Sequence, residues 1–136
     1  MSPQPSDSRP PIAAAVIVHD GRVLLVRRSV AEGSLLWQFP AGEVEAGEST
    51  TEAAVRETAE ETGIVVTARA LLGERVHPAT RRTMVYVACD FMAGTARAAD
   101  EETAEVAWCG LAQLADYVPR GFYGPVQQHL DRTMAA

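Results

Sequence analysis

Apolar and polar positions divide the chain into short apolar runs and one strongly amphipathic stretch. Runs rich in β-branched and other apolar residues predict five strands, which cover 12–18, 22–28, 64–76, 83–92 and 104–109. Between the first two runs stands Asp20-Gly21, a pair typical of a type I′ hairpin turn, so these strands are expected to be antiparallel. Residues 29–36 are predicted to form a loop, followed by a short extended segment that ends at Pro40.

The amphipathic stretch predicts a helix at about 50–62. Ser49 and Glu52 have the spacing of a capping box, in which each residue caps the other's backbone at the start of a helix. Gly63 stands where a glycine commonly ends one. The interior is rich in Ala, Glu and Arg, which favour helix.

The order of elements predicts the fold class. Two further helical patterns cover 111–118 and 125–134, and the second begins with a proline suited to a first helical turn. Strands before and after the central helix, with helices at the end, favour a mixed sheet flanked by helices, an α/β sandwich. The Pro- and Ser-rich residues 1–11 are expected to form a disordered tail, which leaves 12–136 as a single domain.

Composition and charge narrow the classes of function. The formal net charge of −6 argues against a nucleic-acid polymer as the main partner, because phosphate backbones are bound by excess positive charge. All twelve basic residues are arginine, so Schiff-base lysine chemistry and a Walker A lysine are excluded. No secretory-signal pattern and no apolar stretch of roughly 20 residues is seen, so we expect a cytoplasmic protein without a membrane partner. Cys89 and Cys109 are interpreted as buried apolar residues and not as a zinc site.

Three carboxylates on the predicted helix require an explanation. Glu57, Glu60 and Glu61 fall within an arc of about 100°, and the helix has only one basic residue, Arg56. Like charges at this spacing destabilise a helix, whereas a divalent cation would turn the repulsion into coordination. Oxygen-rich sites suit Mg²⁺ or Mn²⁺. The alternative is a solvated acidic face that binds a protein and no metal.

The helix is also expected to have an opposite, core-facing side made of Val55, Thr58, Ala59 and Thr62. Ala53 and Ala54, on the acidic side, are expected to leave open space for a ligand.

A known pattern covers this region. Gly42, five residues, Glu48, seven residues and then the run from Arg56 to Ile64 resemble the Nudix box, G-x5-E-x7-R-E-U-x-E-E-x-G-U, where U is a bulky aliphatic residue. Every fixed Gly, Glu and Arg of the box is present. One U position differs, since it is occupied by Thr58, and we expect this change to affect packing more than metal binding.

The resemblance implies a Nudix-type α/β/α sandwich and an enzyme that hydrolyses the pyrophosphate linkage of a nucleoside diphosphate-X compound. It also implies Mg²⁺, with Mn²⁺ as a substitute, and a homodimer. The positions that match metal ligands are Gly42, through its carbonyl, Glu57, Glu60 and Glu61. Arg56 matches the arginine that pairs with Glu48, so both have a supporting role.

The general base varies in this family, and three glutamates are candidates. Glu57 and Glu60 lie inside the box, and Glu102 belongs to a distant loop that resembles one often used for this purpose, with Glu105 in reserve. An ordinary polar loop explains the acidic residues around Glu102 equally well.

Substrate contacts are predicted from residue type. The arginines able to hold phosphate oxygens are Arg27, Arg28, Arg81 and Arg82, and the aromatic residues able to stack on a base are Trp37, Phe39, Tyr86, Phe122 and Tyr123. We favour a nucleoside or deoxynucleoside triphosphate that is split into monophosphate and pyrophosphate. ADP-ribose or a nucleotide sugar is the alternative, because Pro40-Ala41-Gly42 and Pro78 resemble features of enzymes that split ADP-ribose. A Nudix module that binds nucleotides without hydrolysing them is the alternative from another class.

Overall fold

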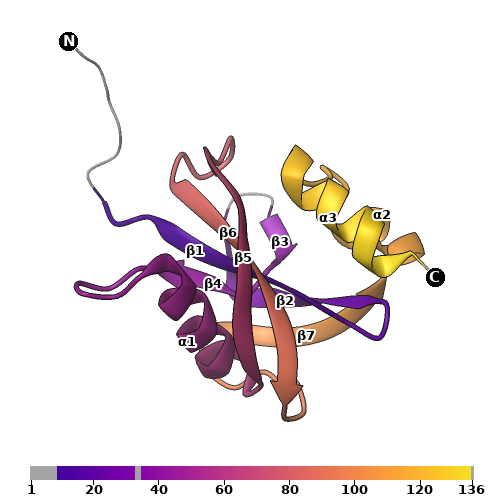
Figure 1. Cartoon of the computed structure of the whole chain (residues 1–136), viewed down its shortest axis with the longest axis horizontal. Helices are drawn as coiled ribbons and strands as arrows, with labels where there is room; N and C mark the ends of the chain where they lie inside the picture. The colour runs from indigo at the N-terminus through magenta and orange to yellow at the C-terminus, as the bar shows by residue number, and fades with distance from the viewer. Residues whose placement is uncertain (1–8, 33–34, 136) are drawn as a thin grey trace.

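The computed structural model describes residues 9–32 and 35–135 (Figure 1). Its elements are β1 (Ile12–His19), β2 (Arg22–Glu32), β3 (Leu35–Gln38), β4 (Ala41–Glu43), α1 (Thr50–Thr62), β5 (Val65–Val76), β6 (Thr83–Ala93), β7 (Thr103–Gly110), a 3₁₀ turn (Leu111–Gln113), α2 (Leu114–Tyr117) and α3 (Gly124–Met134). Within these described residues, every helix is too short or too polar to cross a membrane. Residues 1–8 of the predicted disordered tail lie outside the described residues.

A mixed sheet of seven strands forms the centre of the described structure, and β1 links its two parts. Residues Ile12 to Ile17 pair with β6 in parallel, while the start of β1 also pairs with antiparallel β4. The end of β1 pairs with β2, which carries β3 and β7, and β5 pairs with β6. Asp20 and Gly21 both have positive φ, as a type I′ turn requires, so the predicted hairpin is confirmed.

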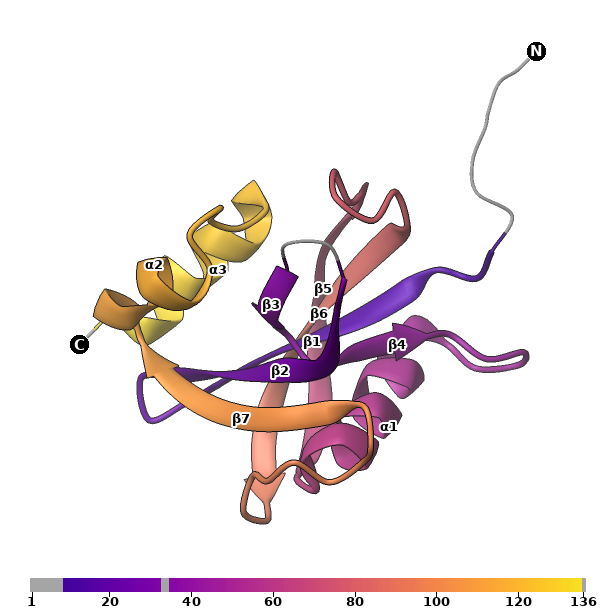
Figure 2. The ribbon, with the colours of Figure 1, turned by 180° about the vertical axis from the view of Figure 1, so that it is seen from behind.

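Both faces of β1 are buried, and its small residues allow helices to pack closely. Ala13, Ala15 and Ile17 belong to the core cluster that includes Ala53 and Ala54 of α1. The alternating positions Ala14 and Val16 belong to a second cluster with Val126 and Leu130 of α3. Figure 1 shows α1 on one side of the sheet and α3 on the other, and Figure 2 shows the same layers from behind. The predicted α/β sandwich is therefore confirmed.

Helix α1 has the predicted boundaries. The Ser49 hydroxyl accepts a hydrogen bond from the Glu52 amide at 3.1 Å, and the Glu52 carboxylate accepts one from the Ser49 amide at 2.9 Å. At the other end Gly63 has φ of 78° and donates its amide hydrogen to Ala59. Both caps satisfy backbone groups that a helix end leaves unpaired.

The predicted core face of α1 is only partly correct: Thr58 and Thr62 are buried as expected, but Ala59 is not. Ala53, Ala54, Thr58, Thr62 and Glu61 are buried, while Ala59 is exposed and Val55 is partly exposed. The helix is rotated because the two alanines pack against the small residues of β1, so they fill the space that was expected to be open. Thr58 is compatible with this core because its hydroxyl donates to the Ala54 carbonyl at 2.8 Å.

Of two other predictions, one is wrong because of strand pairing, and the other is correct in type, although the helix is shorter and less regular than expected. The loop predicted over 29–36 is largely strand, because β2 continues to Glu32 and pairs with β3. The helix predicted over 111–118 is a 3₁₀ turn followed by a single turn of α2. Val118 leaves the helical region with φ of −130°, as a residue before a proline tends to do.

Candidate active site

A cavity of about 770 Å³ lies on the sheet face that also carries α3. Its floor crosses four strands, because residues of β5, β6, β1 and β4 all line it. The described lining combines acidic, basic and aromatic side chains, which include Arg28, Trp37, Phe39, Glu43, Glu57, Arg75, Arg82, Tyr86, Glu102, Arg120, Phe122 and Tyr123. This size lies within the range of pockets that hold small organic ligands, about 300–1,000 Å³.

Glu57 reaches the cavity from α1 by passing next to Gly42 of β4. The Glu57 side chain is 15% exposed, and a Cβ atom added to Gly42 would overlap its carboxylate. Glycine is thus the residue that allows this carboxylate to lie against the edge strand. The box spacing brings Gly42 and Glu57 into contact at one end of the cavity.

Glu61 lies one turn further along α1 and is buried, with 2% of its surface exposed. Its Oε1 atom accepts a hydrogen bond from the Ala41 amide at 3.3 Å. Burial, and then the charge of the neighbouring Glu57 carboxylate, raise the pKa of Glu61. Burial also raises the pKa of Glu57. Two adjacent carboxylates are therefore held where two negative charges repel each other.

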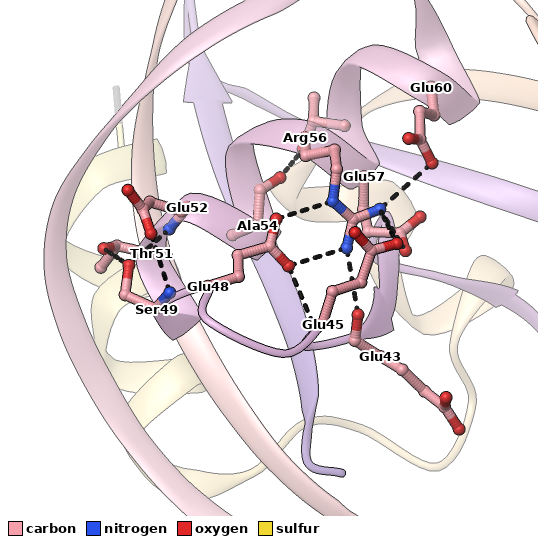
Figure 3. Close-up of polar contacts among 11 residues, drawn as sticks. Glu43, Glu45, Glu48, Ser49, Thr51, Glu52, Ala54, Arg56, Glu57 and Glu60 are labelled. Carbon is pink, nitrogen blue, oxygen red and sulfur yellow. Dashed lines mark hydrogen bonds and ion pairs between the residues drawn. The ribbon is translucent and has the colours of Figure 1, made fainter.

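Arg56 joins several of the remaining acidic groups of the box (Figure 3). Its Nε and Nη2 atoms donate to the two oxygens of Glu48 at 2.7 and 2.9 Å, a bidentate pair. Its Nη1 atom donates to Glu57 at 3.1 Å and to Glu60 at 3.3 Å, and Nη2 also donates to the Glu43 carbonyl at 3.1 Å. The bond from Arg56 lowers the pKa of Glu48 to about 2. These contacts fix the loop before α1 against the helix.

The donor set at Gly42 fits a hard divalent cation. Glu57 and Glu61 offer carboxylate oxygens in a partly dry site, where a cation would offset the cost of burying their charges, which is the main reason that the pKa of each is raised. Glu60 lies apart from this pair, since its side chain is 53% exposed and bound to Arg56. Among the described side chains, no three acidic, His or Cys groups converge as a complete metal site would require. The structure thus brings together two of the three predicted carboxylate ligands.

Glu102 lies at the cavity, and Glu105 does not appear in the described lining. The Glu102 carboxylate is 3.6 Å from Nη2 of Arg28, and its side chain is 70% exposed. The backbone carbonyl of Glu102 accepts a hydrogen bond from the Ser29 amide at 2.8 Å, which anchors this loop to β2. Glu105 instead pairs with Arg27 at 2.6 Å. Of these two glutamates, Glu102 is the one that lines the cavity, whereas Glu105 lies on β7.

Of the other predicted substrate residues, some line the cavity and others do not. Arg28, Arg82 and Tyr86 belong to the described lining of the cavity, whereas Arg27 and Arg81 do not. Arg82 is already bound, because its Nη2 atom donates to Glu43 and to the Pro10 carbonyl, both at 2.9 Å.

Sequence patterns missed Arg75 and Arg120, which both line the cavity. Arg75 lies on β5, where the sheet register pairs it with Met84 of β6. Both residues line the cavity. Arg120 lies in the segment between α2 and α3. Neither arginine belongs to a local motif, so only the pairing of β5 with β6 or the placement of α3 could have identified them.

Known proteins resemble this chain in sequence and in structure. The family model described as NUDIX domain matches residues 9–128. A protein named MutT4 from Mycobacterium tuberculosis is 37% identical over 100 residues, which is 66% of this chain and 39% of that protein. An RNA pyrophosphohydrolase from Halorhodospira halophila is 45% identical over 78 residues, 57% of this chain and 39% of that protein. The aligned parts therefore span about two fifths of these curated relatives.

A crystal structure of a NUDIX hydrolase from Nitrosomonas europaea has the same fold. The TM-score is 0.76 over 93% of this chain and 72% of that chain, at 22% sequence identity.

Proposed function

The chain belongs to the Nudix family, and we propose that it hydrolyses a pyrophosphate linkage in a nucleotide with the help of Mg²⁺ or Mn²⁺. The observation that carries the proposal is the partly buried Glu57 against Gly42 at one end of a cavity of about 770 Å³, with the buried Glu61 next to it on α1 and bonded to the Ala41 amide. A protein that used its acidic helix only as a solvated surface would not need to bury carboxylates in this way. The metal-free interaction surface is therefore disfavoured.

Each box residue has a role in the proposal. Gly42, through its carbonyl, and Glu57, Glu60 and Glu61 would hold the cation, and Glu60 would first have to give up its hydrogen bond from Arg56. When bound, the ion neutralises charge on the pyrophosphate and lowers the pKa of a bound water. Glu48 supports the site by fixing Arg56 through two hydrogen bonds.

We assign the general base to Glu102, with Glu57 and Glu60 as the alternatives inside the box. A base needs to reach the proton that it removes, and Glu102 lies at the cavity on a loop that is anchored only through its backbone and Arg28. Glu60 is directed to Arg56 and is absent from the described lining, which makes it the weakest of the three.

The favoured substrate is a nucleoside or deoxynucleoside triphosphate, which would yield monophosphate and pyrophosphate. Aromatic side chains and arginines in one cavity suit a base and a phosphate chain. ADP-ribose or a nucleotide sugar remains the alternative substrate class. A non-catalytic module is disfavoured because Glu48, Glu57, Glu60 and Glu61 are all present.

Cytoplasmic location and a homodimer stay predictions. Cys89 and Cys109 are both free and buried, which suits a reducing compartment.

A substrate panel with Mg²⁺ tests the proposal. It contains the nucleoside triphosphates, ADP-ribose, a nucleotide sugar and a short RNA with a 5′-triphosphate, because one relative is named RNA pyrophosphohydrolase. We expect monophosphate and pyrophosphate from a nucleoside triphosphate, and loss of the reaction when a chelator is added. Turnover of ADP-ribose or RNA alone would replace the favoured substrate, and no turnover of any compound would overturn the proposed activity.

A further inference from the structure

Arg75 lies at the far end of the cavity from the carboxylate pair. The sheet register aligns Arg75 with Met84, Met84 with Ile12, and Ile12 with Glu43, and all four residues line the cavity. Four adjacent strands are separated by three spacings of about 4.8 Å, so Arg75 and Glu43 lie about 14 Å apart along the floor. A nucleotide whose phosphates lie near Glu57 would therefore direct its base toward Arg75.

Two tyrosines hold Arg75 in place. Its guanidinium carbon lies 5.2 Å from the ring centre of Tyr123 and 5.9 Å from that of Tyr86, and its Nε atom donates to the Tyr86 hydroxyl at 3.3 Å. Tyr123 is fixed on β5, because its hydroxyl donates to the Glu74 carbonyl at 3.0 Å. Its ring also packs against Gly73, where a Cβ atom would lie 3.1 Å from the hydroxyl oxygen.

Arg75 differs from Arg28 and Arg82, two other arginines of the cavity, in its charge partners. Arg28 lies near Glu102, and Arg82 forms an ion pair with Glu43. In residues 9–32 and 35–135, no carboxylate forms an ion pair with Arg75. Arg75 lines a cavity whose lining is also aromatic, with the Phe39 and Phe122 rings 5.4 Å apart.

We propose that Arg75 reads the base of the nucleotide and selects a purine whose exposed edge carries two hydrogen-bond acceptors, as guanine does with O6 and N7. The inference rests on the proposed function. A guanidinium has only donors, so it pairs with two acceptors but not with the 6-amino group of adenine. The aromatic surroundings suit a flat base more than a second phosphate, since ring faces carry partial negative charge.

Binding of nucleoside monophosphates tests this selection without requiring hydrolysis. Isothermal titration calorimetry with Mg²⁺ would compare GMP, IMP, AMP and ribose 5-phosphate. IMP keeps O6 and N7 but lacks the 2-amino group of GMP, AMP has a donor at position 6, and ribose 5-phosphate has no base. The variants are Arg75→Met, which removes the charge, and Arg75→Lys, which keeps the charge without the planar fork. Arg69→Met is the matched control, because Arg69 lies on the same strand and pairs with Asp90 outside this cavity.

For the wild type we expect GMP and IMP to bind equally and AMP at least about tenfold more weakly, as for one bidentate base contact. Arg75→Met and Arg75→Lys should both remove this preference, whereas Arg69→Met should keep it. Equal binding of AMP and GMP by the wild type would overturn the inference, and so would absence of GMP binding. An equal loss of both ligands in Arg75→Met, restored in Arg75→Lys, would assign Arg75 to a phosphate instead.

The two proposals fail separately. Hydrolysis of triphosphates without base preference would overturn only the role of Arg75. Preferential binding of GMP without turnover of any substrate would overturn the activity and leave the base contact in place. Thermal unfolding of each variant shows whether a loss of binding reflects the fold, and Arg75→Lys provides the test if Arg75→Met is unstable.

Discussion

The two ends of the cavity are built in different ways. The acidic end comes from one continuous stretch, in which Gly42, Glu57 and Glu61 meet because a short strand, a loop and a capped helix follow each other. The aromatic end comes from separate elements, with Arg75 on β5, Tyr86 on β6 and Tyr123 before α3. Local spacing is sufficient to build the first end, whereas the second exists only after the sheet has formed.

The two ends of the cavity also carry charges of opposite sign, and a bound ligand could supply a partner to each end. At the acidic end, adjacent carboxylates repel each other and their pKa values are raised. At the aromatic end, Arg75 has no ion pair to a carboxylate within the described ranges. A metal-bound nucleotide would supply both missing partners, a cation for the carboxylates and acceptors for the arginine.

Of the changes predicted here, Glu61→Gln at the acidic end is expected to have the largest effect on activity. The change removes a carboxylate that would ionise to bind the cation, so kcat should fall roughly a thousandfold. Gln has nearly the same shape, and Glu61 is buried with a raised pKa, so the fold should be kept. Steady-state kinetics with saturating Mg²⁺ and a thermal unfolding curve are the measurements. Activity like that of the wild type would remove the acidic end from the mechanism.

The contrast between the ends also explains what could be predicted from the sequence. The α1 boundaries depend on Ser49, Glu52 and Gly63, whose effects are local, and they were predicted correctly. The buried face of α1 depends on what packs against it, and small residues of β1 add Ala53 and Ala54 to the buried side, where the sequence had predicted open space. Arg75 could not be predicted as a site residue, because its position follows from a register across four strands.

A comparison of Glu102→Gln with Glu105→Gln tests whether a loop distant in sequence completes the acidic end. Glu102 lies at the cavity beside Arg28, whereas Glu105 pairs with Arg27 and is not among the described lining residues. Loss of a general base should lower kcat about a hundredfold for Glu102→Gln, and Glu105→Gln should change it less than about twofold. Two equally active variants would return the base to Glu57 or Glu60.

The smallest expected effect is a dependence of stability on pH that belongs to the acidic end. Burial raises the pKa of Glu61 above its ordinary value of 4.5, so above that pH the folded protein holds a proton that the unfolded chain has lost. The contribution of Glu61 to the free energy of unfolding is therefore greatest at low pH and declines as the pH rises. In the absence of metal, raising the pH from about 6 to about 8 should lower the melting temperature of the wild type by roughly 2–6 °C more than that of Glu61→Gln.

His129, whose pKa is lowered mainly by burial, contributes a slope of opposite sign, but it is the same in both proteins and cancels in the comparison. A cation can take the place of the proton only when the carboxylate is ionised, so Mg²⁺ should raise the melting temperature of the wild type more at the higher pH. The aromatic end has no carboxylate that pairs with Arg75 among the described residues, so Arg75→Met should keep the full pH dependence. Parallel melting curves of the wild type and Glu61→Gln at every pH would show that Glu61 is ionised in the folded protein, which would contradict a protonated Glu61 at the acidic end.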